Sequence, residues 1–311
     1  MKRAAVIAGI LTIAIWAAAQ STGAAAQTTP AAGQAAPAQG PPPAQAPPAQ
    51  GAAGQSPAAP GAAAQPAVKR PPQAKTQPEF DAYKVAAATT DAAAQEKASD
   101  DFATKFPDSE LRMLLYKNVM HLYQNANNAE KTEAIGRKVL AIDGDDPDAL
   151  TTVAEVIAER TRDTDLDKDQ RYAEGMKMAE KGLQTIDTDV AVPAGTPQDK
   201  IDAYKAGMRS QAYSTMGAIE YNRNNFPAAQ ADFQKAIDAF PSQPYPPDVL
   251  RLALSLDKQQ KYEEALKVAT RAVELTQDNT TIGSSARRER DRLQQLTGGV
   301  PAQPQAQPPK N

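Results

Sequence analysis

Apolar residues recur every three or four positions from Glu79 to about Leu296, with charged and polar residues between them. This spacing is the period of an amphipathic α-helix. No segment alternates apolar and polar residues over the length of a strand, so we expect an all-α region with essentially no sheet. Proline-rich punctuation, such as Pro107-Asp108-Ser109 and Pro246-Pro247, divides the region into short helices.

The helical pattern repeats along the chain. A shift of 36 residues carries Gly217 onto Ala253 and Ala229 onto Ala265, and the larger apolar positions around them keep their character. Small residues on both sides of a turn allow two antiparallel helices to approach closely, while large residues fill the space toward the next pair. The repeat therefore predicts helical hairpins.

A more divergent version of the repeat lies upstream, where a shift of 34 residues carries Tyr116 onto Leu150 and Val119 onto Val153. Gly136 falls inside a predicted second helix over 129–142, where glycine costs up to about 1 kcal/mol relative to alanine unless close packing requires it. With a further hairpin over 79–106, we expect about five hairpins and a polar capping helix over 281–296.

This arrangement resembles the tetratricopeptide (TPR) repeat, with its large–Leu–small–large first helix and Tyr–Ala–Phe–Ala second helix, most specifically over residues 210–276. The resemblance implies a right-handed TPR-like helical-hairpin solenoid over residues 79–297. It also implies a concave groove, lined by successive first helices, that takes a peptide or a partner helix. Residues one turn away from the packing face would line that groove: Lys117, His121, Gln124, Thr151, Glu155, Gln211, Ser214, Tyr221, Leu250 and Leu254.

Both ends of the chain differ from this region. Residues 1–26 have the pattern of a bacterial signal peptide, with Lys2 and Arg3, an apolar stretch too short for a typical span, and an A-x-A site ending at Ala26. Residues 27–78 are rich in Ala, Pro and Gln and predict a disordered linker, as residues 298–311 predict a disordered tail. We expect a periplasmic or secreted protein, or alternatively an inner-membrane anchor formed by an uncleaved signal.

The composition excludes several kinds of metal-binding and catalytic site. The chain has no cysteine, a single histidine and a formal net charge of −3, which gives no bulk electrostatic reason to bind nucleic acid. Thiolate metal sites and sites built from several histidines are excluded within one chain. No phosphate loop, nucleophile elbow or HExxH motif occurs, so we expect no cofactor and no enzymatic activity. We expect a protein-binding scaffold or adaptor of the cell envelope, in an oligomeric state that the sequence leaves open.

One acidic loop suggests calcium binding as an alternative. Residues 163–174 place acidic side chains at positions 1, 3, 5, 7 and 12, the order of an EF-hand calcium loop. However, Lys168 occupies the position that requires glycine. A solvated acidic loop is the preferred interpretation of this segment over a calcium site. Among functions of the chain, a calcium-stabilised structural module is the alternative to the scaffold, and an enzyme with an unrecognised site is the third. The calcium candidates are Asp163, Asp165, Asp167, Asp169 and Glu174.

Overall fold

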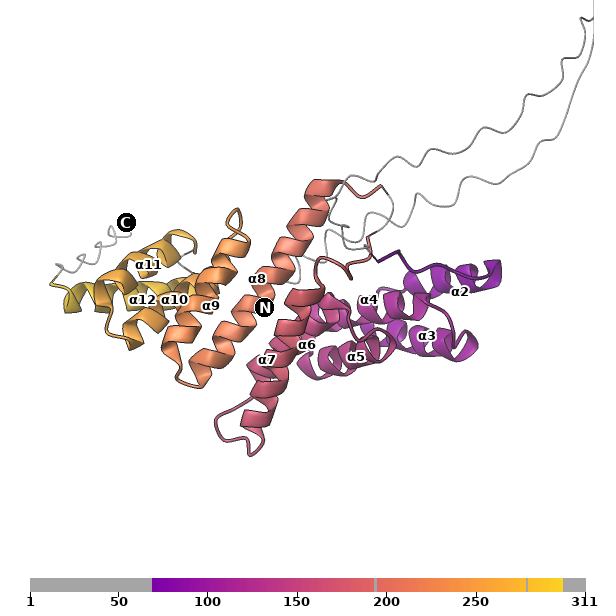
Figure 1. Cartoon of the computed structure of the whole chain (residues 1–311), viewed down its shortest axis with the longest axis horizontal. Helices are drawn as coiled ribbons and strands as arrows, with labels where there is room; N and C mark the ends of the chain where they lie inside the picture. The colour runs from indigo at the N-terminus through magenta and orange to yellow at the C-terminus, as the bar shows by residue number, and fades with distance from the viewer. Residues whose placement is uncertain (1–68, 193–194, 278, 299–311) are drawn as a thin grey trace, which may run out of the picture. The chain divides into compact units, whose positions relative to one another are not determined.

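The computed structural model describes residues 69–192, 195–277 and 279–298. These residues form eleven α-helices and no strand (Figure 1). Five successive pairs pack as antiparallel hairpins, and a last helix, α12 (Thr281–Leu296), packs on the fifth. The pairs are α2 (Gln77–Ala87) with α3 (Ala92–Lys105), α4 (Leu111–Asn125) with α5 (Ala129–Ile142), α6 (Pro147–Arg160) with α7 (Lys168–Thr185), α8 (Gln198–Asn222) with α9 (Phe226–Ala239), and α10 (Pro246–Lys258) with α11 (Tyr262–Glu274). The structure confirms the all-α fold of stacked hairpins.

Side chains that precede five of the eleven described helices accept hydrogen bonds from amide groups of the first turn. The carboxylate of Asp91 accepts a hydrogen bond from Ala94 N at 2.8 Å, and Asp146 accepts one from Ala149 N at 2.9 Å. Thr280 caps α12 in the same way. These local bonds replace the intrahelical partners that the first turn lacks, which explains why the short polar punctuation marks helix starts.

The turns of three hairpins share one backbone conformation. Asn127, Asn224 and Gln260 have φ between 55° and 62°, in the left-handed region. In each turn the following amide reaches back to the carbonyl five residues earlier, as Asn225 N does to Glu220 O at 2.9 Å. This is the Schellman bonding pattern, in which asparagine tolerates the left-handed conformation better than most residues. Asn224 and Gln260 are 36 residues apart, the period of the repeat.

The small residues of the repeat are buried where the helices of a hairpin meet. Ala229, Ala253 and Ala265 are fully buried. A methyl group on Gly217 would lie 2.9 Å from the ring of Phe233, so this glycine allows α9 to pack directly against α8. The close approach predicted from the 36-residue shift is confirmed.

Close packing also explains the glycine inside α5. A methyl group on Gly136 would lie 2.4 Å from Val153 Cγ2 on α6. Val153 is fully buried, as are Val119 and Met120 on α4. The backbone of α5 therefore approaches the next hairpin more closely than alanine would allow, and this contact offsets the low helix propensity of glycine.

The helical region begins earlier than its composition suggests. Helix α2 begins at Gln77, with Thr76 as N-cap and Pro78 in its first turn, inside the segment 27–78 expected to be a linker. Proline is compatible with a helix start because the first amides have no intrahelical partner. The signal segment 1–26, residues 27–68 and residues 299–311 lie outside the described residues.

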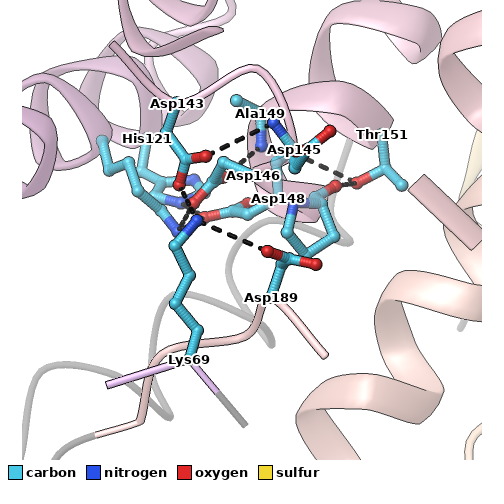
Figure 2. Close-up of polar contacts among 11 residues, drawn as sticks. Lys69, His121, Asp143, Asp145, Asp146, Asp148, Ala149, Thr151 and Asp189 are labelled. Carbon is cyan, nitrogen blue, oxygen red and sulfur yellow. Dashed lines mark hydrogen bonds and ion pairs between the residues drawn. The ribbon is translucent and has the colours of Figure 1, made fainter. Parts of the chain in front are cut away.

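Residues 69–75, which we call the strap, also contact the repeat region. The Lys69 backbone N–H donates to Thr188 O at 2.9 Å, and its ammonium reaches Asp189 at 3.5 Å and, more closely, Asp143 (Figure 2). The guanidinium of Arg70 binds both carboxylate oxygens of Glu110. The strap thus contacts the three connections that join the first four hairpins to one another.

No helix in the described part of the chain combines the length and apolar character needed to cross a bilayer.

Candidate partner-binding face on the first helices

The predicted groove residues belong to the first helices of the second to fifth hairpins, namely α4, α6, α8 and α10. We call the side of these helices that carries them the first-helix face. Neighbouring first helices pack against one another, α6 against α8 and α8 against α10. Polar residues on this face therefore meet across hairpin boundaries.

A charged cluster joins α4 to the start of α6 (Figure 2). Lys117 Nζ lies 2.9 Å from Asp146 Oδ2 and 3.2 Å from Asp148 Oδ2. His121 Nε2 lies 2.9 Å from the same oxygen of Asp148. The aspartates are held by local structure, because Asp146 caps α6 and Asp148 lies in its first turn.

The charges in this cluster stabilise one another. Burial alone would raise the pKa of Asp148, but the cations of His121 and Lys117 hold it well below its usual range. Burial would lower the pKa of His121, yet the charge of Asp148 and hydrogen bonds to Asp148 and Gln124 raise it. The pKa of Lys117 is likewise raised by Asp146 and Asp148 against the effect of burial. These contacts favour the charged form of the lone histidine, which lies in a salt-bridged structural position.

Hydrogen bonds continue from this cluster along the face. Gln124 on α4 and Gln211 on α8 both donate amide hydrogens to Glu155 Oε2 on α6, at 3.5 Å and 2.6 Å. Ser214 on α8 donates to Asp248 in the first turn of α10. Six of the ten predicted residues therefore take part in bonds between successive first helices.

Four of the predicted residues do not offer an open surface. Thr151, Gln211, Ser214 and Leu250 are at most 6% exposed. The Thr151 hydroxyl bonds to the carbonyl of Pro147, and Leu250 belongs to the apolar core around α10. The helical period places these side chains on first helices, but packing against neighbouring helices covers them. Thr151, for example, lies where α7 approaches α6 at Gly182, and such packing cannot be read from the period.

The open part of the face is a pocket of about 220 Å³ between α6, α8 and α10. Its lining residues are Ala158, Glu159, Thr161, Ala218, Tyr221, Asn222 and Arg251. The ring of Tyr221 packs edge-on against Phe226, with centroids 5.4 Å apart, which fixes its orientation. Tyr221 was among the predicted groove residues, and Leu254 lies partly buried against the same core.

Sequence reasoning missed Glu159 and Arg251. Glu159 lies one helical turn after the predicted residue Glu155, and Arg251 directly follows Leu250. A search for unpaired charges one turn away from the predicted groove positions would have found Glu159. Arg251 is identified as a pocket residue only by the packing of α10 beside α8.

The acidic residues of the loop 163–174 do not gather around one point. Helix α7 begins at Lys168, so Asp169 and Glu174 are helical. Glu174 binds Arg137 of α5 at 2.7 Å, and Asp165 accepts a hydrogen bond from Arg162 N at 2.8 Å. Among the described residues, no three acidic or histidine side chains lie close enough to hold a metal ion. The EF-hand order of residues is therefore not matched by EF-hand geometry.

The fold defines the class of the described region, a TPR-like array of helical hairpins with a terminal capping helix. No protein-family model matches the chain. No curated protein matches it by sequence.

Several solved structures are similar in fold. PilW, a widely conserved type IV pilus biogenesis factor, has 17% sequence identity and a TM-score of 0.47, over 72% of this chain and 88% of PilW. A thermophilic TPR protein of Thermus thermophilus has 10% identity and a TM-score of 0.43, over 68% of this chain and 98% of that protein. The assembly chaperone of RpL4 has 11% identity and a TM-score of 0.35, over 71% of this chain and 98% of the chaperone.

Proposed function

We propose that this chain is a non-enzymatic scaffold or adaptor that binds a protein or peptide partner through its first-helix face. The observation that carries the proposal is the open pocket between three successive first helices, with the oriented ring of Tyr221 on one wall. Stacked hairpins present such surfaces without moving, because each hairpin is held by its neighbours.

The state of His121 supports a binding role over a catalytic one. Both ring nitrogens face acceptors, Asp148 Oδ2 at 2.9 Å and Gln124 Oε1 at 3.2 Å. A histidine that donates from both nitrogens has no lone pair to accept a proton from a nucleophile. The only imidazole of the chain is thus committed to holding α4 against α6.

The proposed location is the bacterial cell envelope, either periplasmic or secreted after cleavage near Ala26, or anchored in the inner membrane by an uncleaved signal. The signal pattern of residues 1–26 and the long Ala/Pro/Gln segment support this proposal. Cell fractionation with N-terminal sequencing of the recovered protein tests it. A mature protein that begins at Gln27 supports cleavage, and a cytoplasmic protein that retains Met1 contradicts the proposal.

Photo-crosslinking in living cells tests the binding role. A photoreactive residue at Tyr221 should capture one or a few specific proteins. The same residue at Lys267, exposed on α11, is the matched control and should capture none of them. Equal capture from both positions, or no capture from Tyr221, would contradict binding through this face.

A further inference from the structure

The pocket on the first-helix face has opposite charges on two of its helices. Glu159 comes from α6 and Arg251 from α10. Tyr221 comes from α8, which packs against both of these helices. Each of three successive hairpins therefore contributes one distinct chemical group to the same cavity.

Neither charge is neutralised by a direct contact. Within the described residues, the Glu159 carboxylate and the Arg251 guanidinium have no hydrogen bond or ion pair, although they attract one another across the pocket. By contrast, Lys117 on the same face has two carboxylates within 3.2 Å. Opposite charges that line one pocket without pairing directly remain available to a ligand.

The surroundings of Glu159 favour the arrival of a cation. Glu155 lies one turn earlier on α6 and accepts hydrogen bonds from two neutral amides. Carboxylates at this spacing on a helix repel one another. Glu159 is exposed at the pocket rim, and partial desolvation together with the charge of Glu155 raises its pKa. A basic group near Glu159 would lower its pKa again and stabilise the charged carboxylate, whereas an acidic group would raise the pKa further.

We propose that this pocket recognises a segment of a partner polypeptide that carries one basic and one acidic side chain. The basic group would lie against Glu159, the acidic group against Arg251, and the aliphatic part of the segment against Tyr221. A segment with two like charges would place one of them beside a like charge of the pocket, which disfavours it. This inference rests on the proposed binding function and specifies the chemistry of the partner.

A peptide array tests the inference. Immobilised peptides carry one lysine and one glutamate separated by one to three alanines, in both orders, beside matched Lys–Lys and Glu–Glu peptides. The purified, labelled full chain should bind mixed peptides of one order at least about tenfold more tightly than either uniformly charged set. Equal binding to all sets would overturn the inference.

Charge exchange provides the sharper test. E159Q and R251Q should each weaken binding to the preferred peptides at least about tenfold. The double variant E159R/R251E should prefer the opposite order of lysine and glutamate. Glu264→Gln and Lys267→Gln, on the exposed side of α11, are matched controls and should change neither affinity nor order. An exchanged variant that folds, judged by circular dichroism, and keeps the original order of preference would overturn the inference.

The two proposals can fail separately. If Tyr221 still captures a specific protein in cells while the array shows no preference for mixed peptides, the binding role stands. The proposed recognition of one basic and one acidic side chain is then wrong. If the crosslinker captures nothing and the array shows no preference, both are wrong.

Discussion

The imidazole of His121 on α4 donates from Nε2 to Asp148 Oδ2 on α6 at 2.9 Å, and this contact links the second hairpin to the third. On its other side, Nδ1 faces Gln124 Oε1, whose amide is oriented by its bond to Glu155. Because both nitrogens face acceptors, the geometry favours the cationic form of the imidazole. The first-helix face is thus held together by charge as well as by apolar packing.

The titration of His121 should show this state directly. We expect its pKa to lie above the ordinary value of about 6.5, because Asp148 and the two hydrogen bonds stabilise the charged form. NMR titration of the Hε1 proton measures it without ambiguity, since the chain has one histidine. In D148N the pKa should fall. An unchanged pKa in that variant would show that Asp148 is not its cause.

The same group makes stability depend on pH in a defined direction. Its folded pKa is raised, so its stabilisation is complete below about pH 6.5 and declines as pH rises through the folded pKa. Urea unfolding between pH 6 and pH 9 should therefore show a decrease in the free energy of unfolding. His121→Gln should show a smaller decrease over this range. A wild-type decrease no larger than that of the variant would contradict the assignment.

Removal of Lys117 should be costly. Lys117→Met leaves Asp146, which is little exposed, without the ammonium 2.9 Å away, and leaves Asp148 paired with His121 alone. Breaking a buried ion pair in this way costs roughly 3 kcal/mol, since an uncompensated charge remains. Chemical denaturation measures the change. Lys97→Met is the control, because its pair with Asp101 is exposed and should contribute little. Equal losses in the two variants would contradict the structural role of the cluster.

The contact between Gly136 and Val153 should reverse the usual benefit of alanine in a helix. Gly136→Ala should destabilise the protein by about 1–3 kcal/mol, because its methyl group would overlap Val153 Cγ2. In the background of Val153→Ala, the same change should cost less, since the overlapping methyl group is absent. A double-mutant cycle by urea unfolding measures this coupling. Additive effects would indicate that α5 and α6 do not approach as closely as described.

The strap should loosen when its ion pairs are weakened. Glu110 accepts a hydrogen bond from Gln73 N at 3.2 Å and pairs with Arg70. Glu110→Ala removes both contacts, so amide exchange over residues 69–75 should accelerate. High salt should accelerate it in the wild type, because the Arg70–Glu110 pair is exposed and screened. Hydrogen-exchange mass spectrometry measures both effects, with Lys97→Ala as the control. Exchange that is insensitive to both changes would contradict an anchored strap.

Much of the fold follows from short-range features of the chain. The capping helix spans 281–296 as predicted, and α5 spans 129–142 as predicted. Period, caps and turn residues are local properties, so they can be read without knowledge of any neighbour. The start of the helical domain was predicted less accurately than these elements. Thr76 and Pro78 begin α2, but they lie in a proline-rich segment whose composition indicated a linker.

The candidate site was predicted only in part. Tyr221, one of the predicted groove residues, lines the pocket, whereas Thr151 and Leu250 are buried. A helical period assigns a residue to a face of its own helix, but the distance between neighbouring first helices decides which parts of that face remain open. Arg251 became a candidate only once α10 was placed beside α8.

The amino-acid order alone sufficed for the helices, their pairing and the small residues between them, because these depend on contacts close in sequence. The partners of the polar residues required the packed hairpins. The cap that Asp146 forms at the start of α6 is a local contact, three residues long. The pairing of Asp146 and Asp148 with Lys117 and His121, some 30 residues away, depends on how one hairpin seats against the next.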